Sequence, residues 1–148
     1  MKIWVDADAC PGAIKNIILK AATTRQIHTV FIANKPIYFQ ASPYLSAIQV
    51  NQGADVADQY IVAHSNAGDL VITQDIPLAA LLVAKNIVVI SLHGTLFTPN
   101  NIGERLSIRN FMQDLRDGGT HTGGPKPFSA KDTQKFAQTF DQQVRKLS

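Results

Sequence analysis

Three aspartates follow apolar runs that read as buried strands. Asp6 and Asp8 stand two residues apart in "WVDADACPG", and Asp75 ends the segment "DLVITQD". Carboxylates about 4 Å apart repel by about 4 kcal/mol at an effective dielectric constant of 20, so a converging group needs a cation or a raised pKa. A hard divalent ion such as Mg²⁺ takes oxygen ligands and keeps several waters. These residues therefore indicate a metal site that activates water and clamps a phosphodiester.

Other acids join this group less clearly. Asp55 and Asp58 are spaced by three, which places them on one face of the helix that they begin. That helix is expected to begin on the opposite loop layer or between the layers, and capping is the stronger interpretation for one of the two. Asp75 has the same alternative, since it precedes a second helix. Asp69 enters its strand and is expected at the far edge of the sheet.

Apolar runs alternate with helical patterns along the first 93 residues. We expect strands at 2–5, 29–34, 47–50, 69–75 and 87–92, with helices at 11–26, 55–68 and 76–86. Such alternation predicts an α/β fold, a three-layer sandwich with a mainly parallel central sheet of four or five strands. Ligands of such sheets bind beyond the carboxyl ends of the strands, where Asp6, Asp8 and Asp75 are expected.

Helices are expected after residue 93, where the strands stop. One helix is predicted at 99–117, and the glycine-rich stretch 118–127 favours a linker over an anion-binding loop. A last helix, capped by Ser129, carries Phe136, Phe140 and Val144 at spacing four, which is typical of a docking stripe. The whole chain, 1–148, is thus predicted as one domain, with a core at 1–93 and C-terminal helices at 98–148.

A few polar side chains suit a nucleic acid. Arg105, Arg109 and Arg116 fall within about 40° of one another on the predicted helix, as a basic stripe or an ordinary solvated face. Asn34 and Lys35 follow the second strand on the side of the acids. The net charge of +3 permits an anionic partner without requiring one.

Composition limits the class of protein. No apolar run approaches the roughly 18–20 residues that cross a bilayer, so we expect no membrane association. Cys10 is the only cysteine and cannot form an internal disulfide, which fits the cytoplasm. Its place at a helix start would favour a reactive thiol, but the neighbouring aspartates oppose this. We expect a small packed side chain instead.

Several blocks together resemble a known family. "WVDADACP", "DVADQYIV", "GDLVITQDIPLA", "ERLSIRNFM" and "TGGP" are similar to the uncharacterised bacterial YaiI/YqxD family over nearly the whole chain. This resemblance implies a PIN-like domain, and many PIN domains are Mg²⁺- or Mn²⁺-dependent ribonucleases with an acidic cluster. It places Asp6 and Asp75 in the site, with Asp8 as an extra neighbour and Asp55 or Asp58 as the central acid. The expected function is a metal-dependent nuclease that acts on RNA.

Two other functions remain as alternatives. The pair after the first strand also resembles haloacid-dehalogenase phosphatases, with Asp6 as the nucleophile and Asp8 as the acid/base. Cys10 and Asn34 stand where that family places hydroxyl residues, and Asp69 begins a strand instead of following one. The third hypothesis is a non-catalytic module that binds RNA or another partner.

Overall fold

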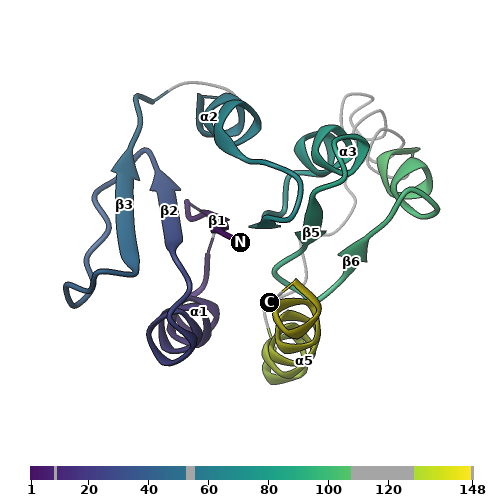
Figure 1. The fold of residues 1–148 in the computed structure, drawn as a ribbon. Helices are drawn as coiled ribbons and strands as arrows, with labels where there is room; N and C mark the ends of the chain where they lie inside the picture. Colours follow the sequence, from purple (N-terminus) through teal and green to yellow (C-terminus); the bar gives the residue numbers. More distant parts are fainter. Residues whose placement is uncertain (9, 53–55, 108–128, 148) are drawn as a thin grey trace.

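A six-stranded sheet forms the centre of the computed structural model, which describes residues 1–8, 10–52, 56–107 and 129–147 (Figure 1). Its strands, in the spatial order β3-β2-β1-β4-β5-β6, are β1 (Ile3–Asp6), β2 (Thr29–Ala33), β3 (Leu45–Gln49), β4 (Leu70–Ile72), β5 (Val88–Ile90) and β6 (Leu96–Phe97). The first five strands pair in parallel, and β6 runs antiparallel to β5. The sheet is therefore mainly parallel, as predicted.

Helices cover both faces of this sheet. They are α1 (Gly12–Arg25), α2 (Val56–His64), α3 (Ile76–Ala84) and α5 (Ala130–Leu147), and residues 102–107 are helical as well. In Figure 1, α1 and α5 lie below the sheet, while α2 and α3 lie above it. This arrangement confirms the predicted α/β sandwich of three layers.

Two separate apolar clusters hold the layers together. On one face, Phe136, Phe140 and Val144 of α5 are at most 2% exposed and pack with Ile14 and Ile18 of α1. On the other face, the cluster is built from α2, α3 and the sheet, and includes Ile61, Leu78, Leu82, Val71 and Val89. The docking stripe predicted for the last helix is thus confirmed. Ser129 also caps this helix, since its Oγ accepts from the N–H of Asp132 at 3.3 Å.

The strands continue beyond residue 93, contrary to the sequence prediction. A tight turn leads from β5 into β6, and Ser91 Oγ accepts from the backbone N–H groups of His93 (3.2 Å) and Thr95 (3.0 Å). The sheet therefore has six strands and not four or five. A two-residue strand is too short to show a periodic pattern, and its pairing with β5 is a tertiary contact.

The helix predicted at 55–68 ends four residues early. In the structure α2 ends at His64, and the backbone N–H of Asn66 donates to the Asp69 carboxylate at 2.9 Å. Asp69 thereby closes the turn into β4. No helix among the described residues is both long and apolar enough to cross a membrane.

Candidate active site at the carboxyl edge of the sheet

The chain reverses direction across the sheet at β1. From β1 it moves outward to β2 and β3, and α2 then carries it back to β4, on the other side of β1. A parallel sheet opens a crevice at such a switch point, beyond the carboxyl ends of the two strands. Asp6 is the last residue of β1, and Thr73 directly follows β4. Both therefore lie at the point where this fold class binds ligands.

One hydroxyl group joins the two strand ends. Thr73 is fully buried, and its Oγ1 donates to Asp6 Oδ2 at 3.0 Å while it accepts from the backbone N–H of Asp75 at 3.0 Å. Asp75 in turn caps α3, because its Oδ1 accepts from the N–H of Leu78 at 2.9 Å. The capping interpretation of Asp75 is thus correct, and it occupies only one of the two carboxylate oxygens.

Asp8 is tied to the next strand. Its exposed carboxylate accepts from the backbone N–H of Asn34, directly after β2, at 3.0 and 3.2 Å from its two oxygens. Asn34 Oδ1 is buried with no hydrogen-bond partner among the described residues. Asp8, Asn34 and the exposed Lys35 are thus neighbours at this edge, as the sequence predicts for residues that leave adjacent parallel strands.

The acids act on one another electrostatically. Burial is the largest cause that raises the pKa of Asp6 above its usual value, and the hydrogen bond from Thr73 opposes it. The negative charges of Asp8 and Asp75 raise the Asp6 pKa further. The carboxylates of Asp8 and Asp75 therefore both repel that of Asp6. A cation placed among the three would relieve this repulsion.

Asp58 borders the same site through a cavity between α2 and α3. This cavity, of about 610 Å³, is lined by Asp58 and Asp75 and by apolar side chains that include Val62, Pro77 and Leu81. The sequence interpretation that α2 begins on the opposite layer or between the layers is wrong, because α2 follows the parallel strand β3 and so begins at the carboxyl edge. Asp55 lies outside the described residues.

Asp69 lies at the far edge of the sheet, as expected, and has a structural role. The residue is 8% exposed, and its carboxylate accepts from the backbone N–H of Lys2 (2.9 Å), from Trp4 Nε1 (3.1 Å) and from the N–H of Asn66. These donors satisfy a buried charge that would otherwise be costly. Asp69 thus fastens the start of β4 to β1.

The surroundings of the Cys10 thiol do not favour a nucleophilic role. Burial raises the pKa of its thiol to about 11, and the charge of Asp6 adds to that effect, while Lys15 opposes both. The thiolate is therefore scarce at neutral pH. This agrees with the expectation of a packed side chain.

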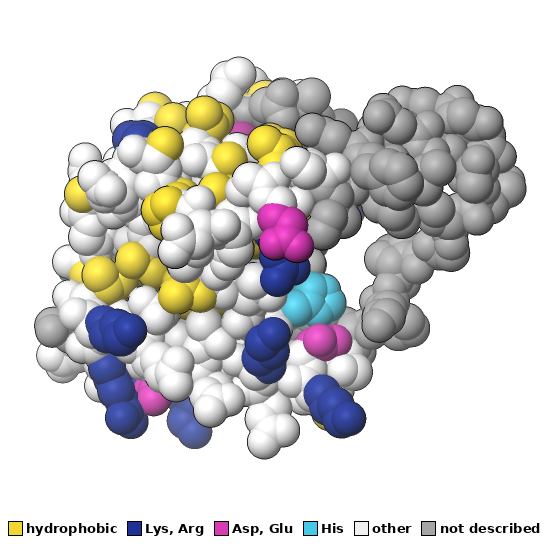
Figure 2. Space-filling view, turned by 90° about the vertical axis from the view of Figure 1, so that its right-hand side faces the viewer, with side chains coloured by type: hydrophobic (Ala, Val, Ile, Leu, Met, Phe, Trp, Pro, Cys, Tyr) yellow, Lys and Arg dark blue, Asp and Glu magenta, His cyan; other side chains and the backbone are white. Residues whose placement is uncertain are grey.

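The predicted basic stripe lies only partly within the described residues. Arg109, Arg116 and the stretch 118–127 fall outside them. Arg105 is exposed on the helical residues after β6, and it lines neither of the cavities that contain Asp8 or Asp75. On the side of the molecule shown in Figure 2, a few Lys and Arg side chains adjoin one another at the lower left, and others are separate, with acidic and histidine side chains near them.

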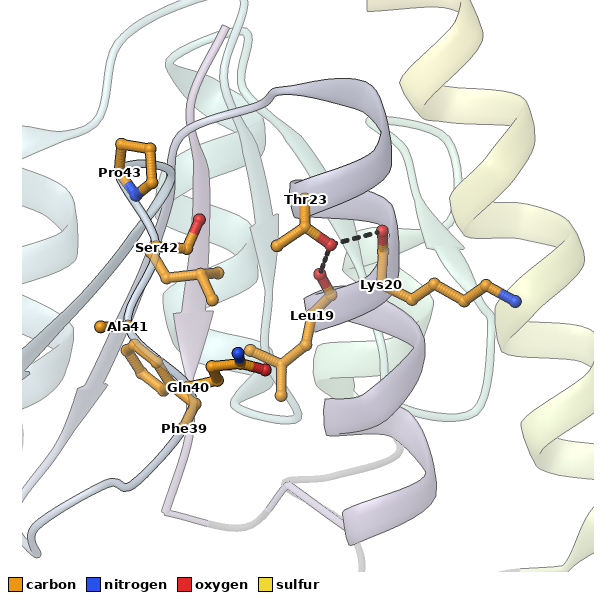
Figure 3. A pocket seen from close by; sticks show the side chains of 9 residues that line it. Leu19, Lys20, Thr23, Phe39, Gln40, Ala41, Ser42 and Pro43 are labelled. Carbon is orange, nitrogen blue, oxygen red and sulfur yellow. Dashed lines mark hydrogen bonds between the residues drawn. The ribbon is translucent and has the colours of Figure 1, made fainter.

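Other cavities lie beside α1, and two of them adjoin the segment between β2 and β3. One of about 530 Å³ separates α1 from residues 39–45, and Figure 3 shows Gln40 beside Leu19 across it. It contains none of the predicted site residues. The other, of about 280 Å³, lies next to Asp8 and is lined by Lys15, Lys35 and Tyr38 among others; we refer to it as the lysine pocket.

Carboxylate oxygens at this edge could hold a divalent ion. Among the described residues, no group of three or more His, Cys, Asp or Glu side chains is arranged as a metal cage. Magnesium commonly binds through one or two carboxylates and completes its shell with waters and substrate phosphates. Asp6 and Asp75 offer two such carboxylates.

The sequence did not predict Thr73 or the apolar cavity lining between α2 and α3 as parts of the site. The only sequence signal for Thr73 is that it is a polar residue at the end of a buried apolar run.

The fold and the site together define an α/β protein with acidic residues at the switch point of a parallel sheet. Residues 4–146 match the family described as "Uncharacterized BCR, YaiI/YqxD family", and the chain belongs to this family. It is similar to a UPF0178 protein of Myxococcus xanthus, with 52% identity over 99% of this chain and 96% of the relative. A UPF0178 protein of Desulfotalea psychrophila is 53% identical over 99% of both chains. No solved structure matches the chain.

Proposed function

We propose that this protein is a divalent-metal-dependent nuclease with a PIN-like fold that hydrolyses RNA phosphodiester bonds in the cytoplasm. The observation that carries the proposal is the link through Thr73, whose hydroxyl joins the Asp6 carboxylate to the backbone N–H of Asp75 at the switch point of the sheet. This is where ligands of such sheets bind. A lone cysteine with a protonated thiol is compatible with the reducing compartment.

The residues divide the work between binding and orientation. Asp6 and Asp75 would hold Mg²⁺ or Mn²⁺, with Asp8 and Asp58 at the margins of the site. The ion would neutralise charge at the phosphodiester and lower the pKa of a bound water for hydrolysis. Thr73 fixes the direction of the Asp6 carboxylate, and the cap of α3 fixes that of Asp75. Lys35 and Asn34 flank Asp8 on the β2 side and would contact the RNA strand.

The decisive experiment measures cleavage of a labelled single-stranded RNA in Mn²⁺, in Mg²⁺ and in EDTA. We expect cleavage in either metal and none in EDTA. Asp6→Asn and Asp75→Asn should each reduce the rate by about 100-fold or more, because metal sites lose 10- to 100-fold even when a supporting residue is changed. Asparagine is as good an N-cap as aspartate, so Asp75→Asn tests the charge while it keeps the cap of α3.

A matched control changes an aspartate on the opposite side of the fold. Asp141 of α5 pairs with Arg25 and Arg145, so Asp141→Asn should leave cleavage unchanged. Cleavage of p-nitrophenyl phosphate without cleavage of RNA would replace the nuclease by the phosphatase alternative, with Asp6 as the nucleophile. RNA binding with no metal-dependent hydrolysis of either substrate would leave a binding module.

A further inference from the structure

The lysine pocket opens beside the acidic site on its β2 side. It has a volume of about 280 Å³, and its lining includes Asp8, Cys10, Lys15, Phe31, Lys35 and Tyr38. Two of these side chains are cationic, and one is the acid that joins the pocket to the site. The negative charge of Asp8 is partly offset, because both of its oxygens accept from the N–H of Asn34. The pocket therefore offers positive charge next to a site proposed to act on phosphodiesters.

Tyr38 presents its ring to solvent at the rim of this pocket. Its exposed fraction is 81%, the highest among the large hydrophobic side chains that are exposed in the described residues. The following residue behaves differently, since Phe39 packs on Phe31 with ring centroids 5.6 Å apart. Lys15 Nζ also donates to the backbone O of Tyr38 at 2.9 Å, which anchors the main chain under the ring. The backbone of Tyr38 is thus anchored, and its exposed ring is open to stacking.

Cationic side chains beside an exposed aromatic ring can bind an unpaired nucleic-acid strand. Its backbone follows positive charge, and each base can stack on an aromatic face. A paired base has its faces covered by its neighbours and cannot reach such a platform. The small volume of the lysine pocket suits one nucleotide and not a duplex.

We propose that the lysine pocket binds one nucleotide of an unpaired RNA strand, with its base on Tyr38 and its phosphate beside Lys35. The inference rests on the proposed function in that the adjacent acids act on the same strand. It adds a residue-level preference for unpaired RNA. Neither Tyr38 nor Lys35 is required to touch the metal site, so binding can be measured apart from hydrolysis.

The test is fluorescence anisotropy with a labelled oligoadenylate, free or paired with oligouridylate, in EDTA to prevent metal-dependent cleavage. Tyr38→Ala should weaken binding of the single strand by roughly 5- to 100-fold, whereas Tyr38→Phe, which keeps the ring, should stay within about twofold. Lys35→Ala should reduce the slope of log affinity against log salt by about 0.7. Duplex binding should be weaker and insensitive to Tyr38.

Lys20→Ala is the charge-matched control. Lys20 is exposed on α1, and Figure 3 shows its side chain extending away from residues 39–43. It should leave the affinity unchanged, and melting curves would establish that every variant is folded. Equal losses of single-strand affinity in Tyr38→Ala and Tyr38→Phe would overturn the proposal that the lysine pocket binds a nucleotide. Equal salt slopes for Lys35→Ala and wild type would overturn it as well. If Tyr38→Ala still cleaves RNA and binds the single strand with unchanged affinity, this inference alone is refuted. If binding depends on Tyr38 but no RNA is cleaved, only the nuclease proposal is refuted.

Discussion

At the scale of single residues, Thr73 has the largest consequence for the site. Its hydroxyl is fully buried, donates to the Asp6 carboxylate and accepts from the N–H of Asp75. A hydroxyl has one donor and two acceptor lone pairs, so both contacts can be made at once. The side chain thus sets the direction of Asp6 and the start of α3 together.

The raised pKa of Asp6 predicts a pH-dependent cost to stability. Burial and the charges of Asp8 and Asp75 place the pKa in the folded protein above the usual 3.8, so the folded state binds the proton more tightly than the unfolded chain. The destabilisation is absent below 3.8 and grows as pH rises through the folded pKa. Asp6→Asn should therefore unfold at a higher urea concentration than wild type at pH 7, and this advantage should shrink as pH falls towards 4.

Urea midpoints measured from pH 4 to pH 8 check this prediction. Asp8→Asn removes one like charge near Asp6 and should reproduce part of the effect. A constant difference between Asp6→Asn and wild type over the whole pH range would show that ionisation of Asp6 carries no such cost.

At the scale of elements, α5 depends on a close approach to the turn between β5 and β6. Gly94 has a φ of +83°, and a Cβ placed there would lie 2.6 Å from the backbone carbon of Lys135 in α5. Thr139 Oγ1 of the same helix donates to Gly94 O at 2.8 Å. Glycine at this position therefore lets α5 lie directly on the turn.

Gly94→Ala should destabilise the protein by more than Gly68→Ala. Both glycines have a positive φ, of +83° and +95°, but a Cβ at Gly68 would meet nothing within 4 Å. The left-handed backbone costs alanine about 1–2 kcal/mol at either position. Overpacking against α5 adds about 1–3 kcal/mol at Gly94 alone. Urea denaturation of the two variants measures this difference, and equal losses would show that α5 can shift without cost.

At the scale of the whole molecule, helices cover both faces of the sheet, and the candidate site lies at its carboxyl edge. The apolar clusters on the two faces share β1, β2, β4 and β5, whose side chains alternate between them. A ligand held between the ends of β1 and β4 thus bridges strands at the centre of the fold. Binding there would be coupled to global unfolding.

Divalent metal should consequently raise the melting temperature. At ten times its dissociation constant, an ion bound only by the folded state adds about 1.4 kcal/mol, or about 3–6 °C for a chain of this size. Thermal unfolding with increasing Mn²⁺ should show this shift for wild type and for Asp141→Asn, but not for Asp6→Asn. An equal shift in all three proteins would point to ions bound elsewhere.

Much of this organisation is local and was therefore predictable. Apolar runs and helical periodicity identified five of the strands and the helices between them, and the docking face of α5 followed from Phe136 and Phe140 at spacing four. The rule that parallel strands end at one edge predicts that Asp6, Asp8 and Asp75 lie on the same side of the sheet. Sequence blocks also identified the YaiI/YqxD family, which the match over residues 4–146 confirms.

The sequence by itself determined which residues form strands and helices and which acids leave the strands at one edge. Only the tertiary structure decided that β6 extends the sheet, that Asp58 shares a cavity with Asp75, and that Thr73 bridges Asp6 to Asp75. The physical reason is the range of the interactions: secondary structure follows from neighbouring side chains, whereas the bond between Thr73 and Asp6 joins residues 67 positions apart, and it exists only once β1 and β4 lie side by side.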